Sequence, residues 1–252
     1  MKPLIIANWK MNPLTVAEAE ELFISIGKGI KDIQKAEVVI CPPFIYLPIL
    51  NSKELSPNVS LGGQDCFWEE KDAFTGEISP KQLSNLGCEY VILGHSERRI
   101  NLKENDAMIN KKIKTVLGTG LKAIFYVGGK SKNMKEVSIQ LKKGLAGFKK
   151  SGFKSSNLII VYEPIYAIST MSGGKAISPE EVIVGIISIK KILSQILGKE
   201  FSSQIKILYG GSVNSENARD FILKSKVDGL LVGGASLKTE EFVKIVKGVS
   251  EI

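Results

Sequence analysis

The sequence predicts a closed parallel α/β barrel built from eight strand–helix units. The chain of 252 residues alternates short apolar runs with longer amphipathic stretches, and eight such pairs can be counted. The apolar runs are continuous, which is typical of parallel strands that helices cover on both faces. Eight units is the number that closes into a barrel. An open doubly wound sheet is the alternative, but it usually has fewer strands, and the first turn here lacks a Gly-x-Gly-x-x-Gly pattern.

The apolar runs give the expected strands, and the stretches between them give the helices. Helix starts are marked by Ser79-Pro80 and Ser178-Pro179, where a capping serine precedes proline, and by the acidic first turn after Thr239. We expect helices at about 16–30, 44–51, 80–86, 103–118, 132–147, 179–197, 215–224 and 239–249. The expected strands are Leu4–Ala7, Glu37–Cys41, Asn58–Gly62, Tyr90–Leu93, Leu121–Val127, Leu158–Tyr162, Ile205–Tyr209 and Gly229–Val232.

Length and composition fit one globular domain over residues 1–252, and its basic balance would also fit a small anionic substrate. Lysine and arginine (34) exceed aspartate and glutamate (26) by 8. The one dense basic stretch, 142–154, has no aromatic pattern or binding motif beside it, so we expect a solvated surface and no nucleic acid. The three cysteines are widely spaced, which predicts reduced thiols and a cytoplasmic protein. No apolar run is long enough for a membrane span or a signal peptide.

Unusual polar residues and glycine pairs follow five of the expected strands. Because parallel strands of a barrel end at one rim, these residues should converge there. They are Asn8 and Lys10 after the first strand, His95 after the fourth, Glu163 after the sixth, Gly210-Gly211-Ser212 after the seventh and Gly233-Gly234 after the eighth.

Each of these residues has a functional interpretation and a plainer one. The glycine pairs favour a phosphate site, because backbone N–H groups in such turns point together, although glycine is also common in simple turns. Glu163 ends a buried strand and is either a general base or half of a buried ion pair. Lys10 is either a substrate partner or a surface lysine. His95, the only histidine, cannot form a multi-histidine metal site; at a helix start it would be neutral and donate a hydrogen bond, unless it is a core residue.

The segment 164–179 is long for a strand–helix connection and rich in small residues, so we expect a lid over the rim, with Ile168 as its apolar tip.

Several motifs in order along the chain resemble the triosephosphate isomerase family over nearly the whole length. The resemblance implies a single (β/α)8 TIM barrel. The motifs are Ala7-Asn8-Trp9-Lys10-Met11-Asn12, Phe74-Thr75-Gly76-Glu77, Gly94-His95-Ser96-Glu97-Arg98-Arg99, Tyr162-Glu163-Pro164, Tyr209-Gly210-Gly211-Ser212-Val213 and the stretch from Asp228 to Leu237.

The resemblance also implies the activity and the role of each residue. The reaction would interconvert dihydroxyacetone phosphate and D-glyceraldehyde 3-phosphate through an enediolate, in glycolysis and gluconeogenesis, with no cofactor and no metal. Glu163 would move the proton, His95 would polarise the carbonyl oxygen and Lys10 would stabilise negative charge. Asn8 would lie beside Lys10, and Glu97 would support the site. The phosphate would bind backbone N–H groups of Ser169, Ser212, Gly233 and Gly234. The family is homodimeric, and the segment around Thr75 would insert into the other subunit near Lys10.

This chain departs from the family pattern at the lid. Tyr166 stands where the family has tryptophan, Ser169 where it has glycine, and Gly129 where it has the glutamate that bonds that tryptophan. Tyr126 replaces a cysteine. We expect either a substitute hinge contact from Tyr126 or Tyr166, or neutral drift. The competing functions are another phosphate-binding barrel enzyme, such as an indole- or ribulose-phosphate enzyme, and a noncatalytic scaffold. The first shares the glycine pairs but lacks the other motifs, and the second predicts a missing base or electrophile.

Overall fold

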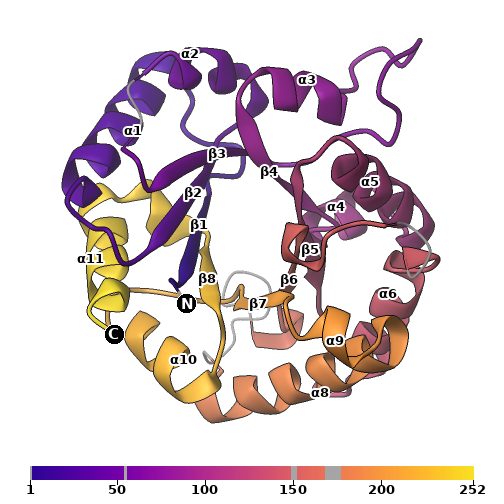
Figure 1. The fold of residues 1–252 in the computed structure, drawn as a ribbon. Helices are drawn as coiled ribbons and strands as arrows, with labels where there is room; N and C mark the ends of the chain where they lie inside the picture. Colours follow the sequence, from indigo (N-terminus) through magenta and orange to yellow (C-terminus); the bar gives the residue numbers. More distant parts are fainter. Residues whose placement is uncertain (1, 54–55, 149–151, 168–176) are drawn as a thin grey trace.

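The strands pair in sequence order, and β1 pairs with β8 to close the sheet (Figure 1). The computed structural model describes residues 2–53, 56–148, 152–167 and 177–252. All the strand pairs are parallel, which confirms the (β/α)8 TIM barrel and excludes the open sheet. The strands are β1 (Leu4–Asn8), β2 (Glu37–Cys41), β3 (Val59–Gly63), β4 (Cys88–Leu93), β5 (Lys122–Val127), β6 (Leu158–Tyr162), β7 (Lys206–Tyr209) and β8 (Gly229–Val232).

Helices surround the barrel and pack their apolar faces on the outward-facing strand residues (Figure 1). The described α-helices are α1 (Val16–Ile30), α2 (Leu47–Asn51), α3 (Pro80–Asn85), α4 (Ser96–Asn101), α5 (Asp106–Gly118), α6 (Lys135–Gly144), α8 (Pro179–Leu197), α9 (Lys199–Ser202), α10 (Ala218–Ser225) and α11 (Thr239–Ser250). Short 3-10 turns are η1 (Phe44–Tyr46), η3 (Ser155–Asn157), η4 (Ile165–Ala167) and η5 (Gly234–Leu237).

Side-chain caps set several helix starts. Ser79 and Ser178 each form a full capping box, with Gln82 and Glu181 as the reciprocal partners, as the serine–proline pairs predict. Three helices begin three residues later than expected from 103, 132 and 215: α5 at Asp106, α6 at Lys135 and α10 at Ala218. Asn105 accepts hydrogen bonds from the N–H groups of Ala107 and Met108, both at 3.0 Å, so α5 begins only at Asp106. The four-residue helix α9 carries too little periodicity to be predicted.

The alternation of side chains along each strand places two polar side chains and one glycine at the top of the barrel. Inward-facing residues fill the interior as a separate apolar cluster that includes Ile6, Val161 and Leu231. Two residues further along each of these three strands, Asn8, Glu163 and Gly233 occupy the same inward face. At β4 the alternation is interrupted by Gly94, whose φ of 71° redirects the chain into His95.

Candidate active site

A cavity of about 320 Å³ opens at the carboxyl ends of the strands. It gathers the described residues that the sequence places at the rim, which come from β1, β4, β6, β7 and β8. Glu97 lies beside it, and Ser169 and Ile168 of the expected lid lie outside the described residues. The predicted residues that line the cavity are Asn8, Lys10, His95, Glu163, Ser212, Gly233 and Gly234.

His95 is the N-cap of α4, and this position decides its tautomer. The backbone N–H of Glu97 donates to Nδ1 of His95 at 3.2 Å, so Nδ1 is an acceptor and the neutral ring carries its proton on Nε2. Burial lowers the pKa of His95 below its ordinary value and outweighs Glu163 and Glu97, which act in the opposite direction. The site therefore holds a neutral imidazole whose N–H points away from the helix.

Glu163 lies across from that N–H. Its side chain is buried, and its Oε1 lies 3.6 Å from Nε2 of His95. Within the described parts of the chain, no lysine or arginine nitrogen lies within 4.0 Å of its carboxylate. The backbone is fixed because the N–H of Glu163 donates to the carbonyl of Val127 at 2.8 Å. The described geometry therefore favours a general base over a buried ion pair.

Lys10 occupies a backbone conformation that a lysine rarely adopts. Its φ is 54°, and its N–H donates to Oδ1 of Asn8 at 3.0 Å. Its Nζ forms an ion pair with Oε1 of Glu97 at 2.5 Å. Because both side chains are more than a third exposed (38% and 42%), solvent screens this pair, and Lys10 remains available to an anion in the cavity.

Gln64 supports the backbone of the candidate site, although the sequence motifs do not include it. Its Nε2 donates to the carbonyl of Lys10 at 2.7 Å and to the carbonyl of Cys41 at 2.9 Å. It therefore holds the left-handed turn at Lys10 in place. The signal was present, because Gln64 directly follows the strand that ends in Gly62-Gly63, as the other rim residues follow theirs.

The two glycine pairs differ in what requires them. A Cβ atom on Gly211 would lie 2.1 Å from the Tyr209 hydroxyl, and one on Gly210 would lie 2.5 Å from Cγ1 of Val161, so internal packing already demands glycine there. A Cβ on Gly234 would meet open space, and one on Gly233 would make only an ordinary contact with Lys10. Packing within the chain thus leaves the second pair free for the close approach of a ligand to the backbone.

The match to a known family covers the whole barrel and is not limited to one motif. The sequence model described as Triosephosphate isomerase matches residues 3–249 of the chain. The chain belongs to the triosephosphate isomerase family. This confirms the resemblance seen in the sequence.

Individual family members match over nearly their full length. The triosephosphate isomerase of Dictyoglomus turgidum is 42% identical over 252 residues, which cover 98% of this chain and 99% of the relative. The protein of the same name from Dictyoglomus thermophilum is 43% identical over 255 residues, with the same coverage. The one from Aquifex aeolicus is 40% identical over 252 residues, again with 98% and 99% covered.

The two tyrosines that depart from the triosephosphate isomerase pattern lie in different places. Tyr166 is part of η4, three residues after Glu163, and burial together with the side chain of Tyr166 raises the pKa of Tyr162 on β6. Tyr126 lies inside the barrel on β5, below the cavity and edge-on to the ring of His95. Its ring therefore contacts the His95 imidazole, which lies at the rim, and not Tyr166.

Proposed function

We propose that this chain, as one barrel domain over residues 1–252, interconverts dihydroxyacetone phosphate and D-glyceraldehyde 3-phosphate without a cofactor. One observation carries the proposal: the carboxylate of Glu163 faces the protonated Nε2 of His95 at 3.6 Å across the cavity. An aldose–ketose isomerisation needs a base for a carbon-bound proton and a donor for the adjacent oxygen, and this pair provides both. Membership of the triosephosphate isomerase family supports the same enzyme class.

The chemistry follows from the two side chains. Glu163 takes a proton from the carbon next to the carbonyl, and the electron pair of that C–H bond forms the carbon–carbon double bond of an enediolate. The negative charge develops on the former carbonyl oxygen, where the Nε2–H of His95 donates a hydrogen bond. Nε2 of His95 gives its proton to the former carbonyl oxygen and takes up the hydroxyl proton of the neighbouring oxygen, which becomes the new carbonyl, while Glu163 returns its proton to the former carbonyl carbon. Lys10, at the same rim, stabilises the developing charge.

The phosphate group lies at the opposite side of the cavity in this proposal. The backbone N–H groups of Ser212, Gly233, Gly234 and Ser169 bind it, and a formal net charge of +8 favours the approach of an anion. The lid segment 164–179 then excludes water, which protects the enediolate from loss of phosphate. The open space at Gly234 supports this placement, since a phosphate oxygen can reach the backbone there.

The proposal is tested with Glu163→Gln and Glu163→Asp in a coupled isomerase assay. Removing the base lowers kcat by roughly 10³-fold in the glutamine variant, whereas aspartate keeps a carboxylate and retains part of the activity. Glu180→Gln, at an exposed position in the first turn of α8, is the control with wild-type activity. Activity in Glu163→Gln equal to that of the wild type, or none in the wild type, contradicts the proposal.

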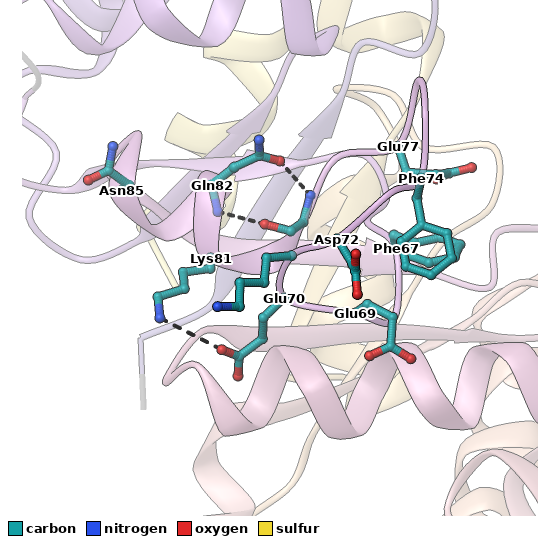
Figure 2. Close-up of a pocket in the computed structure, with 11 residues that line it drawn as sticks. Phe67, Glu69, Glu70, Asp72, Phe74, Glu77, Lys81, Gln82 and Asn85 are labelled. Carbon is teal, nitrogen blue, oxygen red and sulfur yellow. Dashed lines mark hydrogen bonds and ion pairs between the residues drawn. The ribbon is translucent and has the colours of Figure 1, made fainter.

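We further propose a homodimer in which the segment around Thr75 inserts into the other subunit near its Lys10. The connection between β3 and α3 projects from the rim of the barrel (Figure 1). Figure 2 shows how its base is organised: the Phe74 ring lies on the Phe67 ring, with centroids 4.5 Å apart. Met11 and Leu14, just after Lys10, are 86% and 84% exposed, which leaves an apolar surface for a second copy to cover.

The same proposal places the reaction in glycolysis and gluconeogenesis in the cytoplasm. Cys41, Cys66 and Cys88 are all free and buried, which suits a reducing compartment. Within the described parts of the chain, none of the helices combines the length and apolar character needed to cross a membrane. The substrate in this proposal is a small phosphorylated triose, with neither nucleic acid nor membrane as a partner.

A further inference from the structure

Tyr126 forms part of the floor of the catalytic cavity, at a position where the family pattern has a much smaller cysteine. It is on β5 and only 1% exposed, and it belongs to the apolar cluster that fills the barrel interior. It lines the cavity together with Asn8, His95 and Glu163. The residue therefore sits between the packed interior of the barrel and the reacting groups.

The ring of Tyr126 contacts the imidazole directly. The two ring centroids are 4.6 Å apart at an interplanar angle of 62°, an edge-to-face contact. The hydroxyl lies beside the side chain of Asn8 but falls short of hydrogen-bond geometry, so it has no hydrogen-bond partner among the described residues. What Tyr126 gives to the site is therefore mainly its ring.

The imidazole needs a second support. The bond from the Glu97 N–H fixes Nδ1, but one hydrogen bond leaves the ring free to swing about that contact, and the second torsion of histidine is intrinsically broad. The edge contact with Tyr126 restricts this motion from the barrel side. It also keeps water away from that side of the imidazole, because water would favour the charged form of the ring.

We propose that Tyr126 is a positioning residue for the isomerisation, whose ring holds His95 so that Nε2–H points at the substrate oxygen and whose bulk keeps the imidazole dry. This inference rests on the proposed function. The ring of Tyr126 fills the space between Gly210 and His95: an added Cβ on Gly210 would be in ordinary contact with it, 3.7 Å from Cε1, and the ring centroids of Tyr126 and His95 are 4.6 Å apart. Loss of the ring consequently leaves a cavity directly below His95.

The test uses the fact that His95 is the only histidine, so a ¹⁵N spectrum contains one imidazole. In Tyr126→Leu we expect kcat to fall about tenfold with KM within about twofold, because the imidazole is displaced. In the free enzyme the pKa of His95 rises toward its ordinary value, because water enters. The other groups that act on this pKa are Glu163, Glu97, Lys10 and Arg98. Tyr126→Phe keeps the ring and restores both readouts.

Two further variants separate positioning from general destabilisation. Phe125→Leu removes a ring from the residue that precedes Tyr126 on β5. The side chain of Phe125 points outward against Gly144 of α6, so this variant leaves the His95 spectrum unchanged. Tyr126→Met fills nearly the same volume as leucine with a flexible chain and replaces Tyr126→Leu if that variant does not fold. Unchanged His95 signals and kcat in the ring-deletion variant, or an equal shift in Phe125→Leu, overturn the proposal. If the wild type shows no isomerase activity, the proposed function fails, while the His95 spectra still report on the contact.

Discussion

Gly128 packs against the backbone of Glu163 so closely that a Cβ atom on it would lie 1.8 Å from the carbonyl oxygen of Glu163. The N–H and carbonyl of Gly128 are in turn bound by the side chain of Gln140, both at 2.8 Å, so the glycine cannot easily move away. The position of the proposed base therefore depends on the absence of a side chain on the adjacent strand.

We expect Gly128→Ala to lower kcat about 100-fold, because Glu163 must shift by a sizeable fraction of an ångström. Gly129→Ala is the matched control: its Cβ would lie 3.0 Å from Oε2 and 3.4 Å from Cβ of Glu136, an exposed side chain whose carboxylate can give way, and it would touch no backbone atom of Glu163. Steady-state kinetics of the two variants checks the prediction, and equal effects at both positions would contradict it.

Gln64 is expected to act on substrate binding through Lys10. The left-handed conformation of Lys10 costs about 1 kcal/mol, and Gln64→Leu removes the donor that holds its carbonyl. We expect KM to rise about fivefold, equivalent to about 1 kcal/mol, with a smaller change in kcat. Gln204→Leu, which loses a side-chain bond to Ser155 outside the cavity, keeps a wild-type KM. A KM that is unchanged in Gln64→Leu would show that Lys10 holds its geometry alone.

Two buried carboxylates should respond to pH in opposite directions. Asp65 and Glu104 share Lys112 and Arg98, and Nη2 of Arg98 lies 2.8 Å from Oδ2 of Asp65. Burial raises the pKa of Asp65 to about 6, above its ordinary 3.8. Burial also opposes ionisation of Glu104, but hydrogen bonds from Lys112 and Arg98 outweigh it and lower the pKa of Glu104.

The signs follow from linkage. Folded Asp65 holds a proton that the unfolded chain releases between about pH 3.8 and 6, so its charge costs stability at neutral pH and that cost disappears as pH falls through this window. Glu104 contributes stability at neutral pH that is lost on acidification. At pH 7.5 we expect Asp65→Asn to raise the free energy of unfolding by about 1 kcal/mol, and Glu104→Gln to lower it by about 3 kcal/mol.

Urea denaturation at several pH values measures both effects. The Asp65→Asn difference should shrink as pH falls from about 6 to 3.8, whereas the Glu104→Gln difference should shrink only as pH falls below about 4.5, because folded Glu104 keeps its charge until the pH passes its lowered pKa. Differences in the free energy of unfolding that do not change with pH, or that have the same sign for both variants, would show that packing rather than charge dominates at these positions.

Assembly can be tested with Thr75→Arg. A large cation at the tip of the projecting connection should give a monomer at micromolar concentration in sedimentation velocity, with at least about tenfold lower activity because the region near Lys10 loses its cover. Val184→Arg, at a 63% exposed position of α8, is the control that remains dimeric. A wild type that sediments as a monomer would refute the homodimer.

Most of the fold was predictable, because buried parallel strands are continuous apolar runs. β2, β6 and β8 have the expected bounds, and the caps at Ser79 and Ser178 set their helices. The predicted start of α5 at residue 103 was wrong, because Asn105 is the N-cap of a helix that begins at Asp106.

The rim residues were predictable because each follows a strand. The contribution of Gly128 was not, since the collision that requires glycine involves a residue far along the chain. Tyr126 was visible as a departure from the family, but its contact with His95 depends on where β4 and β5 end relative to each other. The local sequence pattern predicts helices, strands and many of their ends. Contacts between residues on neighbouring strands depend on the register of strand pairing, which the local pattern does not contain.

The pairing of β1 with β8 has a consequence for synthesis. Asn8 and Lys10 come from the first strand, whereas Gly233 and Gly234 follow the last, and only this pairing brings them to one cavity. A nascent chain on the ribosome therefore carries an incomplete cavity, with β1 lacking one neighbour, until β8 emerges. We expect the onset of catalysis during translation to be abrupt and to coincide with closure of the barrel, so that enzymatic activity reports completed chains alone.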